Sequence, residues 1–369
     1  MGNFRVGLKK VVDDSYDIEI GYRLEEKLVY DIKNSLVGNL HKFAIVTDDV
    51  VKDLHAEKIC RLLQEEGYTA QVFVFPNGEK SKVRKVKENI EDAMLEAGFR
   101  RDCCMIAVGG GVVTDLAGFT AGTYGRGIPF INYATTLLAA ADASIGGKTA
   151  VDTPLATNLI GIFNQPKKVY IDIAAWKTLP KRQLISGLAE TIKHACLADK
   201  AFFDYLDAHI QEVFDFNNEV LTHIAEENCK IKYDVVMKDE KEANLREVLN
   251  LGHTVGRAIE TVSDYKLLHG EAIGIGLAAE VRLGNQYGYI SEEEKNRVIA
   301  LLKKAGLPTE IPDYINREDL VRKLYTDKKV RDGKLRFVFQ KGIGAVMEFE
   351  NENYARLVPE EDARKVIMS

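Results

Sequence analysis

Short apolar runs alternate with amphipathic stretches through the first half of the chain. Residues 43–47, 70–75 and 103–108 are nearly continuous apolar runs, which is typical of strands buried on both faces of a sheet. Between them, residues 50–66 and 83–97 repeat apolar positions with helical spacing, and each stretch ends at a glycine. Strands that alternate with helices of this length predict βαβ units and a parallel sheet. The same pattern predicts further strands over residues 16–21, 129–133 and 168–172 and a helix over residues 24–36.

The pattern changes near residue 180. Strand signals nearly vanish until residues 335–338, and helical spacing dominates. The predicted helices cover residues 183–206, 217–237, 255–262, 270–288 and 291–305, with a short one over 359–368. We therefore expect two domains, an α/β domain over residues 1–180 and a mainly α-helical domain over residues 181–369.

Composition narrows the class of partner. A net charge of −6 over 369 residues disfavours a nucleic-acid or membrane-surface binder. The five cysteines are odd in number and show no CxxC spacing, which favours reduced thiols in a cytoplasmic protein. The first residues lack the apolar run of a signal peptide, and no run is long enough to span a bilayer. We expect a cytoplasmic protein with a small-molecule substrate.

Glycines follow the strand predicted over residues 103–108. Gly109, Gly110 and Gly111 precede a helical pattern, and such a turn lets backbone N–H groups at a helix start approach a phosphate. The spacing is not GxGxxG, so a tight strand-to-helix turn is the alternative. Glu79 opens another helix, where it could stabilise the helix start or bind a ribose hydroxyl.

A second glycine turn carries a lysine. Gly146-Gly147-Lys148-Thr149 resembles the end of a P-loop, but the leading glycine of that motif would fall on Asp142. This excludes the ATPase interpretation. Lys148 behind two glycines is still well suited to binding an anion.

Three residues could hold a metal ion. His253 and His269 each lie beside a glycine in a chain with seven histidines, and Glu190 lies on a helical pattern upstream. Two histidines and a glutamate form a known catalytic zinc set that leaves one position open. His194 follows Glu190 by one helical turn and is a competing ligand.

Basic residues gather in the same part of the sequence. They are Lys193, Lys230, Lys232, Arg246 and Arg257. A metal ion surrounded by cations indicates an oxygenated, anionic substrate with carboxylate, phosphate or both. The alternative is a solvated charged face. It is strongest for Lys230 and Lys232, because three acidic residues follow between positions 239 and 242.

Together these stretches resemble the 3-dehydroquinate synthase family of sugar phosphate cyclases. The matching motifs run in the family's order over nearly the whole chain. They are Gly78-Glu79-x-x-Lys82, Gly109-Gly110-Gly111-x-x-x-Asp115, Tyr124-x-Arg126-Gly127, Thr135-Thr136-Leu137-Leu138, Asp142-x-Ser144-x-Gly146-Gly147-Lys148-Thr149, Asn158-Leu159-Ile160-Gly161, Gly187-x-Ala189-Glu190-x-Ile192-Lys193, Arg246-x-x-Leu249-Asn250-x-Gly252-His253-Thr254, His269-Gly270-Glu271 and Asp327-Lys328-Lys329.

The resemblance implies a Rossmann-like NAD domain followed by an α-helical metal-binding domain, usually in a homodimer. It implies the cyclisation of 3-deoxy-D-arabino-heptulosonate 7-phosphate to 3-dehydroquinate and phosphate in the shikimate pathway, with NAD used catalytically and Zn²⁺ or Co²⁺ as the metal. The implied metal ligands are Glu190, His253 and His269. The implied substrate contacts are Arg126, Asp142, Lys148, Asn158, Lys193, Lys232, Arg246, Asn250, Arg257 and Lys328 or Lys329, with Arg126 supplied by the partner subunit. The implied NAD contacts are Asp48, Glu79, Lys82, Gly110, Gly111, Val112, Asp115, Thr135, Thr136 and Thr178.

Two departures from the family pattern leave alternatives open. Arg257 stands where the family usually has a histidine, and Thr157 where it usually has a lysine. Arginine binds phosphate but cannot exchange a proton near neutral pH, so Arg257 would restore only the charge that Thr157 removes. A sister cyclase acting on sedoheptulose 7-phosphate or glucose 6-phosphate is the first alternative, although neither carries the carboxylate that Arg246 would bind. A polyol dehydrogenase resembling glycerol dehydrogenase and a non-catalytic binding module are the others.

Overall fold

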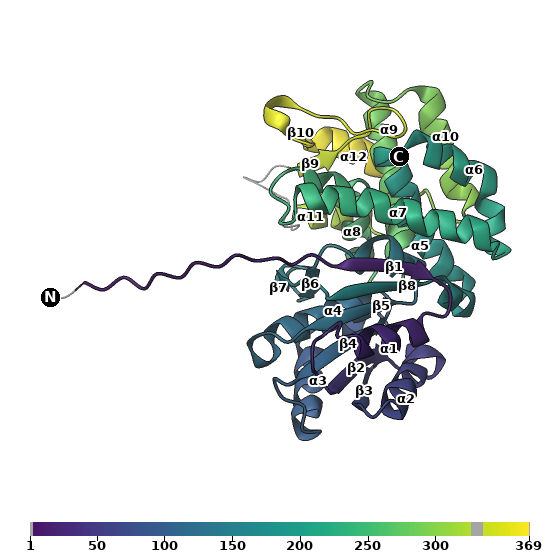
Figure 1. Cartoon of the computed structure of the whole chain (residues 1–369). Coiled ribbons are helices and arrows are strands. Elements are labelled where there is room, and N and C mark those ends of the chain that lie inside the picture. Colours follow the sequence, from purple (N-terminus) through teal and green to yellow (C-terminus); the bar gives the residue numbers. More distant parts are fainter. Residues whose placement is uncertain (1–2, 326–334, 369) are drawn as a thin grey trace.

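The computed structural model describes residues 3–325 and 335–368, and its first half is built on a six-stranded parallel sheet (Figure 1). The strand order is β1-β8-β5-β4-β2-β3. The strands are β1 (Asp17–Gly21), β2 (Lys42–Asp48), β3 (Thr69–Phe75), β4 (Cys103–Gly109), β5 (Phe130–Ala134) and β8 (Lys168–Asp172). All six predicted strands are confirmed.

Helices cover both faces of this sheet. They are α1 (Glu25–Lys33), α2 (Glu57–Glu65), α3 (Arg84–Glu96) and α4 (Gly111–Thr123). Along β4, Cys104 and Ile106 face the core formed with α1 and α2, whereas Cys103 and Met105 face the core formed with α3 and α4. Because both faces are buried, the strand has a continuous apolar sequence rather than an alternating one.

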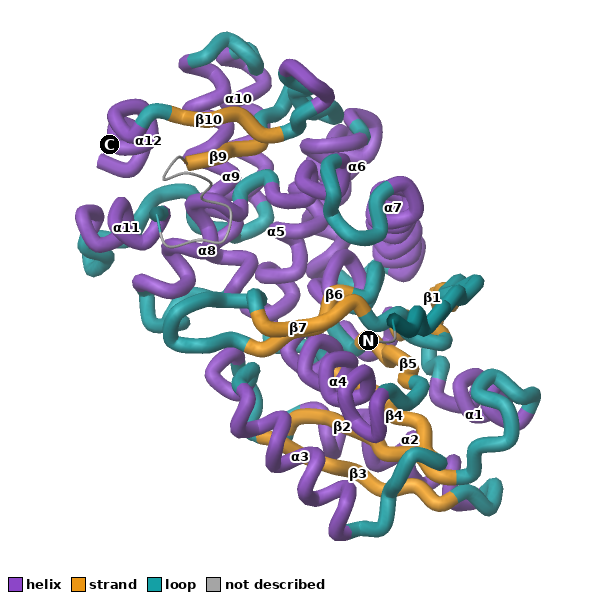
Figure 2. The backbone as a smooth tube through the Cα atoms, turned by 90° about the vertical axis from the view of Figure 1, so that its left-hand side faces the viewer, coloured by secondary structure: helices purple, strands orange, loops and turns teal. Residues whose placement is uncertain are grey.

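A two-stranded antiparallel hairpin, which the sequence pattern did not predict, lies between the sheet and the helical half (Figure 2). It consists of β6 (Lys148–Val151) and β7 (Ile160–Phe163). Gly161 of β7 lies directly against β6, because an added Cβ would come within 2.0 Å of the Thr149 carbonyl oxygen. The hairpin carries Lys148 at one end and Asn158 in the loop at the other, and because both residues line the same cavity, the hairpin is part of the site.

The second half is mainly helical, as predicted. Its helices are α5 (Lys181–Ala198), α6 (Lys200–Phe214), α7 (Asn218–Lys238), α8 (His253–Val262), α9 (His269–Gln286), α10 (Glu292–Lys304), α11 (Arg317–Leu324) and α12 (Glu360–Met368). A small antiparallel pair joins β9 (Leu335–Val338) to β10 (Ala355–Val358). No helix among the described residues is both long and apolar enough to cross a membrane.

One predicted helix was wrong in its extent. Residues 183–206 were predicted as a single helix, but the chain breaks at Asp199, which has extended backbone angles. The Asp199 carboxylate accepts hydrogen bonds from the backbone N–H groups of Ala201 and Phe202, and therefore caps a new helix. The periodicity continues across the break because both helices turn their apolar side chains into one core.

The two halves share that core. Val169 and Ile171 of β8 lie in the same buried cluster as Leu188 and Ile192 of α5 and Leu277 of α9. The helix that carries Glu190 therefore shares its buried core with the sheet, and its Gly187 lies against Leu137 and Leu138, which follow β5. The predicted boundary at residue 180 stays a prediction.

Candidate active site

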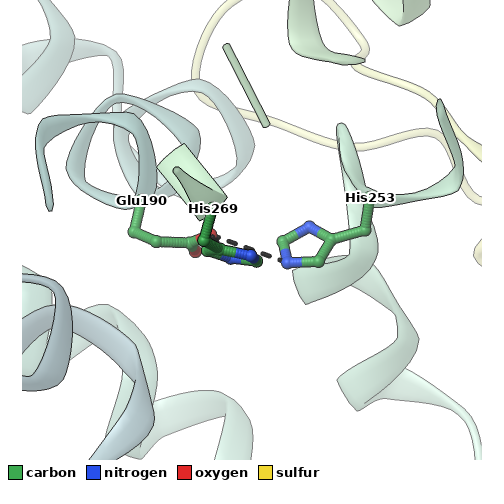
Figure 3. A group of neighbouring side chains, drawn as sticks. All are labelled: Glu190, His253 and His269. Atoms are coloured by element: carbon green, nitrogen blue, oxygen red, sulfur yellow. Dashed lines mark hydrogen bonds and ion pairs between the residues drawn. The ribbon is translucent and has the colours of Figure 1, made fainter. Parts of the chain in front are cut away.

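Glu190, His253 and His269 meet at one point in the helical half (Figure 3). Glu190 lies within α5 and is fully buried, whereas His253 and His269 are the first residues of α8 and α9. The Glu190 Oε1 atom lies 3.6 Å from His253 Nε2 and 3.2 Å from His269 Nε2. Three elements that are distant in sequence thus place one carboxylate and two imidazoles around a common centre.

Glycines permit this convergence. A Cβ at Gly270 would lie 1.8 Å from the Ser186 carbonyl oxygen, so only glycine lets the start of α9 touch α5. A Cβ at Gly276 would lie 2.0 Å from the Gly252 carbonyl oxygen, which fixes α9 against the start of α8. Gly252 itself has a φ of +79° and turns the chain just before His253.

Each imidazole is oriented by a second partner. His253 Nδ1 lies 3.1 Å from the Leu251 carbonyl oxygen, and His269 Nδ1 lies 3.3 Å from Glu260 Oε2. Since Nδ1 donates to these oxygens, the Nε2 atom of each ring is turned toward the common centre, as metal-binding histidines require. Burial opposes a charge on His269, but Glu260 and Glu190 raise its pKa to about 10. This donor set fits a divalent metal ion with an open coordination position.

His194 belongs to a second group with Asp142 and Glu190, whose ligand atoms also lie close together. His194 Nδ1 is 2.9 Å from Asn228 Oδ1, so its Nε2 faces the two carboxylates. However, Lys193 already forms an ion pair with Glu190, and Lys232 forms one with Asp142. Both carboxylates of this group are thus paired with an ammonium group, whereas the His253 and His269 group has one such carboxylate and two imidazoles and is therefore the better metal site.

A cavity of about 330 Å³ adjoins the metal candidates and collects most of the predicted substrate contacts. Those lining it are Asp142, Lys148, Asn158, Lys232, Arg246, Asn250 and Arg257. Asp142 lines the cavity and has a carboxylate oxygen within 4.8 Å of Glu190, so the cavity and the metal candidates are adjacent. Arg126, by contrast, is exposed and does not line it. Lys328 and Lys329 lie outside the described residues.

Arg246 is a fully buried residue whose side chain lines this cavity. It donates to the backbone carbonyl oxygens of Gly146, at 2.9 Å, and of Glu240. Its Nε is buried without a hydrogen-bond partner among the described residues. Nearby, Asp142 neutralises Lys232. A guanidinium with an unpaired donor is prepared for an anionic group.

Lys148, Asn158 and Arg257 also line the cavity. Burial lowers the pKa of Lys148 to about 7. The positive charge of Arg246 acts in the same direction, and the carboxylate of Glu242 partly opposes both. Asn158 has a φ of +54° and a buried Oδ1 without a partner among the described residues. No hydrogen bond or ion pair within the described part of the chain engages the Arg257 guanidinium. These groups together could bind a phosphate.

The predicted nucleotide contacts lie at the carboxyl ends of the parallel strands, where such sheets bind ligands. Each follows a different strand of the sheet: Asp48 ends β2, Glu79 follows β3, Gly110 follows β4, Thr135 and Thr136 follow β5, and Thr178 follows β8. Lys82 forms ion pairs with Glu79 and Asp115. Gly110 and Gly111 open α4, where backbone N–H groups are free for a phosphate, and the buried Thr135 hydroxyl has no partner among the described residues. These features fit a dinucleotide.

Two functional candidates were missed from the sequence. Glu260 orients His269, and Glu242 forms an ion pair with Lys148. Glu242 lies in a polar run, which sequence patterns assign to solvated surface, and Glu260 is a single carboxylate in a helical pattern, which is commonly read as the exposed face. Glu260 lies on α8 two turns beyond His253, and that spacing was the available signal.

The parallel sheet with its glycine turn suits a dinucleotide and the Glu190, His253 and His269 group suits a divalent metal, so the site is that of an NAD- and metal-dependent enzyme. One solved structure of this fold is 2-epi-5-epi-valiolone synthase from Streptomyces hygroscopicus subsp. jinggangensis 5008, with NAD⁺ and Zn²⁺ bound. It is 28% identical, covers 99% of this chain and 98% of its own, and has a TM-score of 0.86.

Sequence comparison gives the family. The family models described as the 3-dehydroquinate synthase N-terminal and C-terminal regions match residues 72–186 and 187–330. The 3-dehydroquinate synthase of Caldanaerobacter subterraneus subsp. tengcongensis is 42% identical and covers 96% of this chain and 97% of its own. That of Thermoanaerobacter pseudethanolicus is 41% identical, with coverage of 89% and 92%. The chain belongs to the 3-dehydroquinate synthase family.

Proposed function

We propose that the chain converts 3-deoxy-D-arabino-heptulosonate 7-phosphate to 3-dehydroquinate and phosphate, with catalytic NAD and a divalent metal, Zn²⁺ or Co²⁺. The main support for this function is the cavity beside Glu190. It has a buried Arg246 with a free donor for a carboxylate, and it also holds Lys148, Asn158 and Arg257 for a phosphate. Such a cavity matches a substrate with two anionic groups.

The residues have distinct roles in this proposal. Glu190, His253 and His269 would hold the metal, which would supply Lewis-acid polarisation of one substrate hydroxyl, while bound NAD would supply hydride transfer from and back to the carbon that carries it. Lys193, held against Glu190, contacts that hydroxyl, while Lys232, Asp142 and Asn250 contact the remaining hydroxyls and the carboxylate. Oxidation next to the phosphorylated end acidifies the neighbouring C–H, so phosphate leaves by elimination. Reduction, ring opening and aldol closure complete the cycle. Lys148, Asn158 and Arg257 position the departing phosphate. Arg257 stays protonated, so it cannot exchange a proton with that phosphate.

Arg246 favours this substrate over those of sister cyclases. Sedoheptulose 7-phosphate and glucose 6-phosphate have no carboxylate, so their binding would leave a buried guanidinium with an unpaired donor. A site built to pair a charged group rejects ligands that lack the partner by orders of magnitude. The same cation-rich cavity argues against a simple polyol dehydrogenase.

NAD binds at the carboxyl edge of the sheet, in the α/β domain proposed for residues 1–180. The residues proposed to contact it are Asp48, Glu79, Lys82, Gly110, Gly111, Val112, Asp115, Thr135, Thr136 and Thr178. Residues 181–369 form the metal- and substrate-binding domain. A cytoplasmic location agrees with five free, buried cysteines.

The functional unit is a homodimer in this proposal. Arg126 is exposed in the single chain, with a φ of +69°, and reaches the cavity only from a second copy. The arm before β1 extends away from the body (Figure 1). Its alternate residues Phe4, Val6 and Leu8 are 92%, 82% and 87% exposed, which is the pattern of a strand that lacks its partner. Mixing Arg126→Ala protein with Lys148→Ala protein tests this, because hybrid dimers would regain activity. No recovery, or a monomer by light scattering, would contradict it.

The reaction is tested by phosphate release from 3-deoxy-D-arabino-heptulosonate 7-phosphate with Zn²⁺ and a sub-stoichiometric amount of NAD⁺. Phosphate release without net NADH is expected. Turnover of sedoheptulose 7-phosphate or glucose 6-phosphate instead would make the chain a sister cyclase. Steady NADH formation from a polyol would make it a dehydrogenase.

A further inference from the structure

Glu242 is a carboxylate inside a cavity that otherwise suits anions. Its Oε2 lies 2.7 Å from Lys148 Nζ, and its Oε1 accepts a hydrogen bond from Asn250 Nδ2 at 3.1 Å. All three residues line the cavity. One carboxylate oxygen of Glu242 therefore binds the lysine, as an oxygen of a bound phosphate would do, and the other accepts the amide of Asn250.

The backbone holds Glu242 in this place at a cost. Glu242 has a φ of +57°, in the left-handed region that residues other than glycine seldom adopt. The turn is fixed from outside the cavity, because the Asp239 carboxylate accepts hydrogen bonds from the backbone N–H groups of Ala243, Asn244 and Arg246. A strained conformation that the surroundings enforce is typical of functional positions.

The charges around Lys148 explain why an internal carboxylate is needed. Arg246 and Lys232 line the same cavity and both disfavour a charge on Lys148. Asp142, which also lines the cavity, is already paired with Lys232 and is therefore not the partner of Lys148. Without Glu242, Lys148 would face Arg246 and Lys232 with no anion of its own, so its ammonium group would be driven away from the cavity or lose its proton.

We infer that Glu242 is an internal stand-in for phosphate: it holds Lys148 in the cavity before substrate binds and is displaced from Lys148 by the phosphate of the substrate, which also frees Asn250 for the substrate's other oxygens. Glu242 is thus a positioning residue that sets the affinity of the cavity for phosphate. It keeps the site organised between turnovers and, by competing with the product, favours the release of inorganic phosphate. This inference rests on the proposed function, because the proposed function assigns the phosphate of the substrate to Lys148.

The test is calorimetric titration of inorganic phosphate into the NAD⁺- and Zn²⁺-loaded protein at about pH 6, where Lys148 keeps its proton. Glu242→Gln keeps the shape of the side chain and removes the charge that competes with phosphate for Lys148. The Kd of this variant for phosphate should therefore fall about tenfold, because the Glu242–Lys148 ion pair no longer has to be broken when phosphate binds. In turnover assays the same variant should show stronger competitive inhibition by phosphate. In Glu242→Asp the charge is withdrawn by one methylene group, so the Kd of this variant for phosphate should lie between those of the parent protein and Glu242→Gln.

Glu240→Gln is the matched control. Glu240 lies two residues away in the same loop and is exposed, and its side chain accepts a hydrogen bond from Gln165 rather than contacting Lys148. This change removes the same charge from the chain but should leave the phosphate Kd within about twofold of the parent value. Equal tightening in both variants would reduce the effect to net charge and overturn the inference.

Two other outcomes also decide the question. Unchanged or weaker phosphate binding by Glu242→Gln, in protein with the parent's melting temperature, would make Glu242 a fixed part of the binding site and overturn the inference, as would a parent protein that binds no phosphate. If that variant unfolds, the comparison of Glu242→Asp with the parent decides in the same way. Tighter phosphate binding in a protein that does not turn over 3-deoxy-D-arabino-heptulosonate 7-phosphate would support the inference while refuting the proposed function.

Discussion

Glu260 offers the sharpest test of the proposed metal site. Its Oε2 atom lies 3.3 Å from His269 Nδ1, while the other nitrogen of that ring faces Glu190 at 3.2 Å. Glu260 lies on α8 and His269 on α9, so the contact joins two helices. Glu260→Gln keeps the volume and an oxygen acceptor but removes the charge. The variant therefore isolates the electrostatic part of the orientation of His269.

The magnitude follows from the contact. A hydrogen bond to a charged group contributes about 1.5–3 kcal/mol, and a neutral one about 0.5–1.5 kcal/mol. Losing the charge should cost metal binding about 1–2 kcal/mol, or roughly tenfold in Kd. Free rotation of the imidazole would add to this, because loss of such outer partners typically lowers metal affinity by about 10–100-fold.

The assay is competition for Zn²⁺ between the protein and a chromophoric chelator of known affinity. Glu212→Gln is the control, because Glu212 is a glutamate on α6 that pairs with His209 far from the metal candidates. A Zn²⁺ affinity within twofold of the parent in Glu260→Gln would refute the orienting role. A loss of the same size in Glu212→Gln would show that the change is not local to the metal site.

Three further predictions follow from single contacts. Gly270→Ala should lower the free energy of unfolding by about 3 kcal/mol or more and weaken Zn²⁺ binding, because its Cβ would lie 1.8 Å from the Ser186 carbonyl oxygen; parent-like thermal melting would contradict this. Arg257→Ala should raise KM for the sugar phosphate at least about tenfold, since a phosphate contact would be lost, and full activity with unchanged KM would remove Arg257 from the site. Burial opposes ionisation of Asp31, but hydrogen bonds from Lys168 and other neighbours outweigh burial and lower the pKa of Asp31 to about 2. The Asp31 carboxylate therefore stabilises the fold fully above about pH 4 and progressively less as the pH falls toward 2. Asp31→Asn should therefore cost about 2 kcal/mol of unfolding free energy at neutral pH, and a loss that persisted undiminished at pH 2 would refute this linkage.

The sequence was most informative where one structural rule dominated. The strands of the sheet were predicted because burial on both faces demands continuous apolar residues, as in β4. The extent of α5 was wrong because the Asp199 cap competes with a periodicity that runs through both helices. The hairpin of β6 and β7 was missed because its four-residue strands lie between glycine-rich motifs, whose residues indicate turns.

The site was predictable in part for a related reason. Glu190, His253 and His269 were selected by ligand chemistry and neighbouring glycines, and the structure brings them together. Glu242 and Glu260 were not selected: the spacing of Glu260 from His253 on one helix was a weak local signal, and Glu242 had none. Their importance comes only from contacts across the fold, which the order of residues along the chain does not reveal.

The core shared by β8, α5 and α9 has a consequence for how this enzyme can be recombined. Val169, Ile171 and Leu188 lose their common neighbours if the chain is cut near residue 180. The nucleotide half and the metal half should therefore not behave as exchangeable modules. A chimera that joins the sheet of one cyclase to the helices of another would have to match side-chain volumes along this seam before any change of substrate could be observed.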